Sequence, residues 1–315
     1  MQDAIREKDD ILLKASTGLE GGCVANGSTC GIATGGALSI ALMVDQGLQK
    51  GEAFPERAVL ESVGGYLDWF KREHGTTQCR ERNNVDFHKV SGQLKYFLSS
   101  SKMLRCMLLT GSALNYLTLS ENFQVSSPDK PSRDIESSAS IHCARNVLES
   151  VRERTGIGND RLERLSIVFD GGVGLRGVLC GALSGAILAL NLLHGFNLRQ
   201  MSYFSNFKKF LIGHINLLRK KSGRSIDTFF IGKQMTNEFR KNAGSIECST
   251  ITGRTFANPE DFREYIETSE PCRNLIRISA DIAVKAIEET RDIVESESRK
   301  TPAVLGESVI RKKIL

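Results

Sequence analysis

The chain has 315 residues, of which 40% are hydrophobic and 25% charged, and a formal net charge of +5. This length accommodates two domains of ordinary size, each with its own core, and the composition is that of a globular rather than a disordered protein. The positive charge is mild, and the basic cluster at 219–224 lacks interleaved aromatic residues. We therefore expect no nucleic-acid binding.

The sequence also argues against targeting and membrane insertion. Residues 1–14 are charged throughout and contain no apolar core, so they do not resemble a signal segment. The uncharged run 177–198 is long enough to span a bilayer, but it contains Asn191, His194 and Asn197. We expect a buried helix there, no membrane span and a cytoplasmic location.

The first half of the chain is predicted to be helical. A glycine-rich segment, 21–35, leads into an apolar helix that should end near Gly47. Cys79 is expected on a loop beyond Gly75, a glycine placed to end a helix, and Cys106 in the first turn of the last helix. Apolar residues at helical spacing predict the other helices, at 3–17, 58–73, 89–99 and 104–119.

Residues 121–140 interrupt this pattern. The segment contains Pro128, Pro131 and many serines, and it has no hydrophobic periodicity. We predict that it links two halves of the chain.

The second half follows the same plan. A helix from 141 precedes a segment 161–169 and a glycine-rich loop, and an apolar helix starts at about Val178. A long helix or helix pair is predicted from 198 to 242, and Cys248 is expected on the loop that follows Gly244. Further helices are expected to start at Asn258-Pro259 and at Ser269-Glu270-Pro271-Cys272, the latter running to about Ser298. Strand patterns are scarce, so the predicted fold is mainly α.

The two halves are internal repeats. Residues 21–35 overlay 171–185 without a gap, and the Cys30-Gly31 and Cys180-Gly181 pairs coincide. The segments that end at Cys79 and Cys248 match in the same way. We therefore predict two tandem helical repeats, each with a glycine-rich loop that leads into an apolar core helix. The predicted boundaries are 1–120 for the first repeat, 121–140 for the linker, 141–298 for the second repeat and 299–315 for a basic tail.

The stretch around Cys180 combines flexible backbone with a thiol. Four glycines precede Cys180, so the backbone there can adopt positive φ and approach a neighbour closely. A position in the first turn of a helix would favour the thiolate. Gly181, Gly185 and Ala189 fall on one face of that helix, and we expect another helix to pack there.

The cysteines are the most informative residues. The chain has eight of them and no Cys-x-x-Cys pair, which argues against a thioredoxin-type motif, a zinc ribbon and a c-type haem attachment site. An isolated cysteine is often only a small buried side chain. Recurrence at three positions in both repeats favours metal binding or redox chemistry instead, because alanine or valine would satisfy burial alone.

A known family has this set of features. The segment Cys143-Ala-Arg-Asn-Val-Leu, the Cys180-Gly-Ala-Leu-Ser-Gly run, Cys248 after Gly-Ser-Ile-Glu, and the late Pro271-Cys272 together resemble the redox-active family named for its C-GCAxxG-C-C pattern. The resemblance covers 137–296 fully and 1–119 in part. It implies a mostly helical fold of about half the chain per copy. A similar domain occurs in split-Soret cytochromes c beside haem and a proposed iron–sulfur centre, but this chain lacks the Cys-x-x-Cys-His sites that bind haem.

Four thiolates that converge from separate helix ends and loops would form a soft, negatively charged site, and such ligands suit iron–sulfur clusters, zinc or copper(I). We expect Cys143, Cys180, Cys248 and Cys272 to bind one iron–sulfur cluster. A second cluster would use Cys23, Cys30, Cys79 and Cys106. Glycine N–H groups would point at cluster sulfur, and the cofactor-binding glycines are predicted to be Gly22, Gly27, Gly31, Gly172, Gly177 and Gly181.

The first repeat departs from the family pattern. The position that matches Cys143 would fall before Met1, and the additional Cys23 overlays Val173. Either Cys23 replaces the missing ligand, or the first repeat is an impaired copy retained for packing.

The predicted function is electron transfer with a redox partner protein, and the sequence also allows a homo-oligomer. Three alternatives stay open: metal-free thiol–disulfide exchange, structural zinc, and partner binding with buried cysteines. No set of catalytic residues stands out. His142 is expected at the surface, and Asp170, which parallels Glu20, is expected to cap a helix or hold the glycine loop. The G-x-G-x-x-G match at 172–177 follows a helical pattern rather than a strand, so we do not interpret it as a dinucleotide site.

Overall fold

The computed structural model describes residues 2–3, 7–49, 51–119, 140–219 and 226–300, with side chains up to Arg291. Throughout these ranges the regular structure is helical, and β-structure is limited to two isolated bridges, Thr29 with Gln78 and Leu179 with Glu247. The mainly α prediction is confirmed. The predicted linker and most of the predicted basic tail lie outside the described residues.

The described residues of the first repeat form one 3-10 helix and six α-helices. The helix α1 begins later than predicted, at Asp10, and α6 begins earlier, at Ser100. The core helix α2 is capped by Cys30, and the predicted helix 3–17 is confined to α1. The elements are α1 (Asp10–Ser16), η1 (Thr17–Leu19), α2 (Gly31–Gly47), α3 (Glu56–His74), α4 (Cys79–Asn83), α5 (Val90–Phe97) and α6 (Ser100–Leu119).

The second repeat has the same order of elements with two additions. The helix α7 precedes the repeated part, and α10 is inserted between the core helix and α11. The predicted helical stretch 198–242 is therefore a pair, α10 and α11. The elements are α7 (Cys143–Thr155), α8 (Asp160–Leu165), η3 (Ser166–Phe169), α9 (Gly181–His194), α10 (Tyr203–Asn216), α11 (Thr228–Ala243), α12 (Cys248–Thr252), α13 (Pro259–Thr268) and α14 (Glu270–Lys300).

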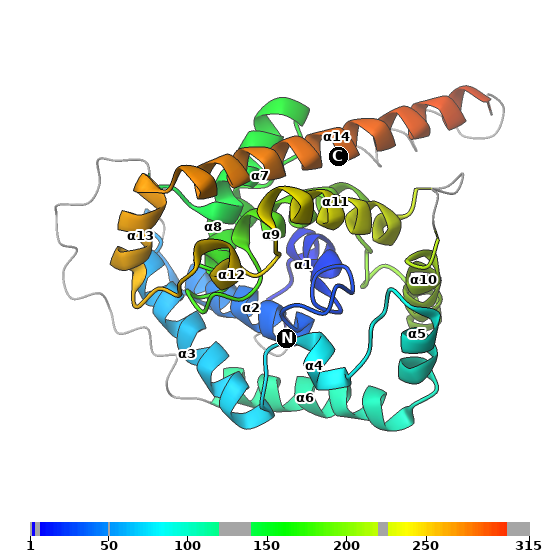
Figure 1. Ribbon diagram of the computed structural model, residues 1–315, viewed down its shortest axis with the longest axis horizontal. Helices are drawn as coiled ribbons and strands as arrows, with labels where there is room; N and C mark the ends of the chain where they lie inside the picture. Colours follow the sequence, from blue (N-terminus) through cyan, green and yellow to red (C-terminus); the bar gives the residue numbers. More distant parts are fainter. Residues whose placement is uncertain (1, 4–6, 50, 120–139, 220–225, 301–315) are drawn as a thin grey trace.

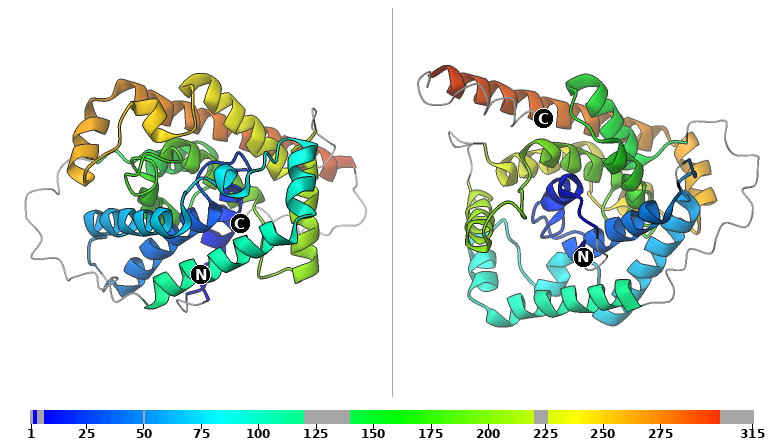
Figure 2. Two further views of the ribbon diagram at one scale, coloured as in Figure 1. Left: turned by 60° about the horizontal axis from the view of Figure 1, so that its bottom comes forward. Right: turned by 180° about the vertical axis from the view of Figure 1, so that it is seen from behind.

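The repeats face each other across the molecule. In Figure 1, α6 runs along the lower edge and α14 along the upper edge, while α5 lies at the right and α13 at the left. The core helices α2 and α9 lie between them, as the further views of Figure 2 also show. Corresponding helices therefore lie on opposite sides of a shared centre.

The repeats share one apolar core because each covers the core helix of the other. Helix α1 of the first repeat packs on α9, and α8 of the second packs on α2. Gly18 lies so close to α9 that a Cβ atom there would stand 2.7 Å from Ile187. Buried residues from both repeats form one continuous cluster.

The predicted glycine strip on α9 is confirmed as a packing surface. A Cβ atom on Gly181 would lie 2.7 Å from the Cys143 Cβ atom, and one on Gly185 would lie 2.7 Å from the Ala144 carbonyl oxygen. Helix α7 therefore lies directly against this face of α9, and it delivers Cys143 to the start of α9.

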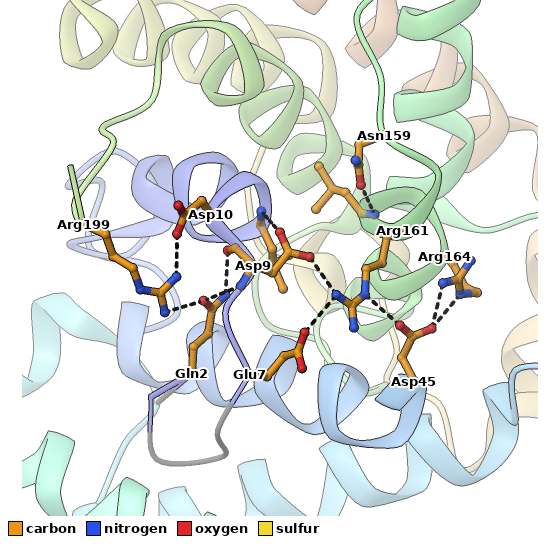
Figure 3. Close-up of polar contacts among 11 residues, drawn as sticks. Gln2, Glu7, Asp9, Asp10, Asp45, Asn159, Arg161, Arg164 and Arg199 are labelled. Atoms are coloured by element: carbon orange, nitrogen blue, oxygen red, sulfur yellow. Dashed lines mark hydrogen bonds and ion pairs between the residues drawn. The ribbon is translucent and has the colours of Figure 1, made fainter. Parts of the chain in front are cut away.

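Ion pairs join the two repeats at the surface. The Arg161 guanidinium of α8 lies 2.8 Å from Asp45 of α2 and 3.2 Å from both Glu7 and Asp9 (Figure 3). Arg164 pairs with the other oxygen of Asp45 at 2.8 Å. These contacts fix α8 against α2 and the segment before α1.

No helix among the described residues is both long and apolar enough to cross a membrane. The apolar run that leads from the glycine loop to Leu198 forms α9, whose residues from Gly181 to Asn191 are all buried within the protein.

The packing of α7 on α9 predicts a contrast between two glycines. Gly185→Ala should lower the free energy of unfolding by about 1–3 kcal/mol, because the new methyl group would overlap the α7 backbone. Gly65→Ala is the control, since Gly65 is an exposed residue within α3 that has open space around its Cβ position. It should raise the free energy of unfolding by about 0.5–1 kcal/mol. Urea denaturation of both variants tests this, and equal effects would contradict the packing.

Candidate redox or metal centre

Each glycine loop contains five consecutive residues with positive φ. Residues 21–25 have φ between +50° and +80°, and residues 171–175 have φ between +55° and +77°. Val24 and Val173 are β-branched, for which this conformation is rare, and it costs roughly 1–2 kcal/mol for each non-glycine residue. Strain of this kind persists where the surroundings hold it, often at functional sites.

The second loop places Cys180 beside Cys248. Cys180 is the residue that caps α9, and its N–H donates to the Ile246 carbonyl at 2.9 Å. The Cys248 N–H donates in return to the Val178 carbonyl at 2.7 Å. A Cβ atom on Gly172 would lie only 2.5 Å from the Cys248 Cβ atom, so glycine at 172 is required for this approach.

All four predicted cysteines of the second repeat line one cavity of 20 Å³. Three of them are the first residue of α7, the cap of α9 and the first residue of α12, and Cys272 is the third residue of α14. Cys248 was expected on a loop, but the loop ends there and a short helix begins. The other side chains that line the cavity are almost all apolar and include Phe256, Tyr265 and Ile266.

Burial controls the protonation of these thiols. It raises the pKa of Cys143 and Cys248 well above the usual value and that of Cys180 to about 11. The neighbouring cysteines add to each shift, because several negative charges would share one cavity. The N–H groups of Ala182 and Leu183 at the start of α9 act in the opposite direction on Cys180. Without a cation, Cys143, Cys180 and Cys248 are therefore neutral thiols.

A buried ion pair between His142 and Asp170 holds the backbone of Cys143 in place. The part that His142 plays in it was not predicted from the sequence. One Asp170 oxygen accepts the Cys143 N–H at 2.8 Å, and the other lies 2.6 Å from His142 Nδ1. The side chains of both His142 and Asp170 are buried, so the expectation that His142 lies at the surface is wrong. The chain turns inward before α7, and Glu56 of the first repeat also approaches the imidazole at 3.4 Å. Asp170 caps a helix, as expected, and that helix is α7.

The first repeat has the same reciprocal pair of backbone hydrogen bonds between its two cysteine loops, an arrangement that we call the clasp. The Cys30 N–H donates to the Thr77 carbonyl at 2.7 Å, and the Cys79 N–H donates to the Ser28 carbonyl at 2.7 Å. Cys30 caps α2, and Cys79 is the first residue of α4. These bonds match those of Cys180 and Cys248 one for one.

Cys106 joins this pair through a polar bridge. The Cys106 thiol donates to Asn83 Oδ1 at 3.7 Å, and Asn83 Nδ2 donates to the Cys79 sulfur at 3.5 Å. The Tyr96 hydroxyl donates to Cys106 at 3.6 Å. Burial, and to a lesser degree Cys106, raises the pKa of Cys30 and Cys79. The prediction that Cys106 lies in a first turn is wrong, because α6 begins earlier, at Ser100.

Cys23 lies in a different environment. It is fully buried in the left-handed loop, and burial raises its pKa above the usual range. The carboxylates of Glu247 and Glu20 also raise it, while Arg240 and Thr236 lower it; no cysteine is among these principal influences.

The predicted cofactor-binding glycines lie in close contact with other residues of the chain. A Cβ atom on Gly177 would lie 2.7 Å from Ser249, one on Gly22 would lie 2.4 Å from the Ser28 nitrogen, and one on Gly27 would lie 2.6 Å from Arg80. Gly31 similarly faces Glu20 at 3.2 Å. Gly172 and Gly181 approach Cys248 and Cys143, as described above.

The donor set of the second repeat fits a soft metal centre. Four thiols from four elements surround one cavity, and thiolates prefer zinc, copper(I) and iron–sulfur clusters. Among the described residues, no three His, Cys, Asp or Glu side chains already stand at the spacing that holds a metal ion. Binding therefore requires the thiols to close on the metal and to release their protons.

The chain belongs to the family described as "Putative redox-active protein (C_GCAxxG_C_C)". The family model matches twice, at residues 1–118 and 141–286, which confirms the tandem duplication and the redox-active class. Comparisons with curated proteins and with solved structures gave no match.

The His142–Asp170 pair predicts a specific pH dependence of stability. Burial lowers the pKa of His142, but Asp170 and Glu56 outweigh it and raise that pKa to about 10. An unfolded histidine titrates near 6.5. The stabilisation from the bound proton is therefore complete below about pH 6.5 and is lost as the pH rises through 10.

The variant that tests this is His142→Gln. It should cost about 3–5 kcal/mol at pH 6, because Asp170 loses its buried partner, and progressively less towards pH 10. Urea denaturation of both proteins across this range measures the difference. A difference that does not change with pH would contradict a protonated His142.

Proposed function

We propose that the second repeat is an electron-transfer domain whose centre is an iron–sulfur cluster held by Cys143, Cys180, Cys248 and Cys272. The observation that carries this proposal is the arrival of four thiols, from four separate elements, at one cavity with apolar walls. Each thiol lies within the first turn of a helix or caps one, where the helix dipole favours negative charge.

The protein would contribute placement and electrostatics. The clasp between 178–180 and 246–248 fixes two thiols, and Asp170 holds the backbone of the third. When bound, the cluster would supply one-electron transfer, with a potential that depends on charge, hydrogen bonds to sulfur and solvent access. The buried His142–Asp170 pair adds a fixed pair of charges beside Cys143.

The raised thiol pKa values disfavour metal-free disulfide exchange. Exchange requires attack by a thiolate, and burial keeps Cys143, Cys180 and Cys248 protonated at neutral pH. A metal centre reverses this, because its charge stabilises the thiolates.

A single metal ion is the second candidate. The cavity volume of 20 Å³ is close to that of one water-sized sphere, so a cluster would need the lining side chains to move outward. Four cysteines are also a common donor set for structural zinc. Metal analysis separates the two candidates.

The test uses the full chain, purified without oxygen, and two equivalent substitutions. Cys180→Ser should remove the iron, the acid-labile sulfide and the visible absorbance of the second repeat. Cys30→Ser changes the matching residue of the first repeat and should leave that centre intact.

Iron and sulfide in equal amounts would support the cluster, whereas iron without sulfide would indicate a single iron ion. Zinc alone, or identical spectra for the wild-type protein and Cys180→Ser, would contradict the proposal.

A further inference from the structure

We propose that His214, on the helix inserted into the second repeat, completes a metal site in the first repeat, where Cys30, Cys79, Cys106 and His214 bind a zinc-class divalent ion. This site is separate from the centre of the second repeat and does not depend on it. It uses His214 rather than Cys23 as the fourth donor.

The proposal starts from what surrounds Cys143. In the second repeat, Cys143 packs with Phe256, Phe262 and Ile266, and its backbone is held by Asp170. The position that matches Cys143 in the first repeat precedes residue 1 of the sequence. The described part of the first repeat has counterparts of the surrounding residues, at equal positions in the repeat: Phe87, Gln93, Phe97 and Glu20.

His214 contacts all four of these counterparts. Its Nε2 atom lies 3.5 Å from a Glu20 oxygen, and its ring centroid lies 5.0 Å from that of Phe87 and 5.4 Å from that of Phe97. Gln93 Nε2 donates to the His214 carbonyl. His214 therefore lies in the place, relative to the first repeat, that Cys143 and His142 occupy relative to the second.

The source of His214 is the helix that the first repeat lacks. Helix α10 is inserted between α9 and α11, and His214 lies in its last turn. In Figure 1, α10 stands beside α5 of the first repeat. Helix α10 thus brings His214 to the position beside the first repeat that corresponds to that of Cys143 in the second.

Three buried polar atoms of His214 and Glu20 form no hydrogen bond. The His214 side chain is completely buried, and neither ring nitrogen forms a hydrogen bond. Glu20 Oε1 is also buried without a hydrogen bond. Burying such groups unpaired costs about 1–3 kcal/mol each. A bound ion would satisfy the imidazole directly.

Hydrogen bonds and ring contacts connect the three thiols with His214. Asn83 hydrogen-bonds to both Cys79 and Cys106, and the reciprocal backbone bonds hold Cys30 beside Cys79. Tyr96, whose hydroxyl donates to Cys106, packs on Phe87, the ring that also contacts His214.

The donor set points to zinc-class ions. Three thiolates and one imidazole form a common tetrahedral zinc site. A metal-binding histidine usually donates its other ring N–H to a carboxylate. A Glu20 oxygen lies 3.5 Å from Nε2, so a small movement would form that hydrogen bond and leave Nδ1 for the ion. The side chains would have to close on the ion, because they do not stand at metal spacing as described.

The experiment isolates the first repeat within the full chain. In a Cys180→Ser, Cys248→Ser background, which leaves the second repeat two of its four thiols, the metal-free protein is titrated with Co²⁺ without oxygen. We expect one Co²⁺ per chain with a thiolate-to-cobalt charge-transfer band and tetrahedral d–d bands. Zn²⁺ should displace the Co²⁺ and bleach both.

Three further substitutions, in the same background, identify the fourth ligand. His214→Ala should weaken Co²⁺ binding by at least about 100-fold. Loss of a residue that only hydrogen-bonds to a metal ligand lowers metal affinity by up to about 100-fold, and loss of a ligand itself should cost at least as much. His214→Cys should retain binding and strengthen the charge-transfer band, because a fourth thiolate is added. Cys23→Ser, the matched control, should bind Co²⁺ as the parent does.

Circular dichroism and thermal melting check that each variant folds. If His214→Ala fails to fold, His214→Cys decides the matter, and an unchanged charge-transfer band would overturn the proposal. It is also overturned if the parent binds no Co²⁺, if His214→Ala binds it normally, or if Cys23→Ser alone abolishes binding.

Discussion

The clasp between the glycine loop and the cysteine loop is the interaction on which both candidate sites depend. In each repeat, two cysteines that are distant in sequence exchange backbone hydrogen bonds with each other's loop, at 2.7–2.9 Å. The two clasps also meet, because the Leu179 N–H donates to the Thr29 hydroxyl at 3.0 Å and Gln78 donates to Glu247 at 3.2 Å. Hydrogen bonds within and between the two clasps therefore fix the backbone of two cysteines in each repeat.

The left-handed loops make this clasp geometrically feasible. A right-handed turn would carry the chain along the helix axis, whereas the loop folds back so that Ser28 and Val178 return to Gly22 and Gly172 through bonds of 3.1 and 3.0 Å. The non-glycine residues in the loop bear an unfavourable conformation. The hydrogen bonds across the loop and the burial of Val24 and Val173 offset that cost.

The periodicity and the repeats predicted the helical fold and the tandem duplication, because both follow from local pattern. The cysteine spacing could not reveal the cavity, since Cys143 and Cys272 reach it only through the packing of α7 and α14 on α9. His142 was assigned to the surface because an adjacent helical residue faces away from its neighbour; in fact it precedes α7 in extended conformation. Asp170, the partner of His142, stands out in the sequence because it occupies the position that matches Glu20 in the first repeat.

The exchange of parts between repeats explains why the two halves can diverge without losing their core. Because α1 covers α9 and α8 covers α2, neither repeat can bury its core helix alone. The inserted α10 extends this exchange, because its His214 lies beside Glu20 of the first repeat. A change in one half of the chain can therefore alter the surroundings of a site in the other.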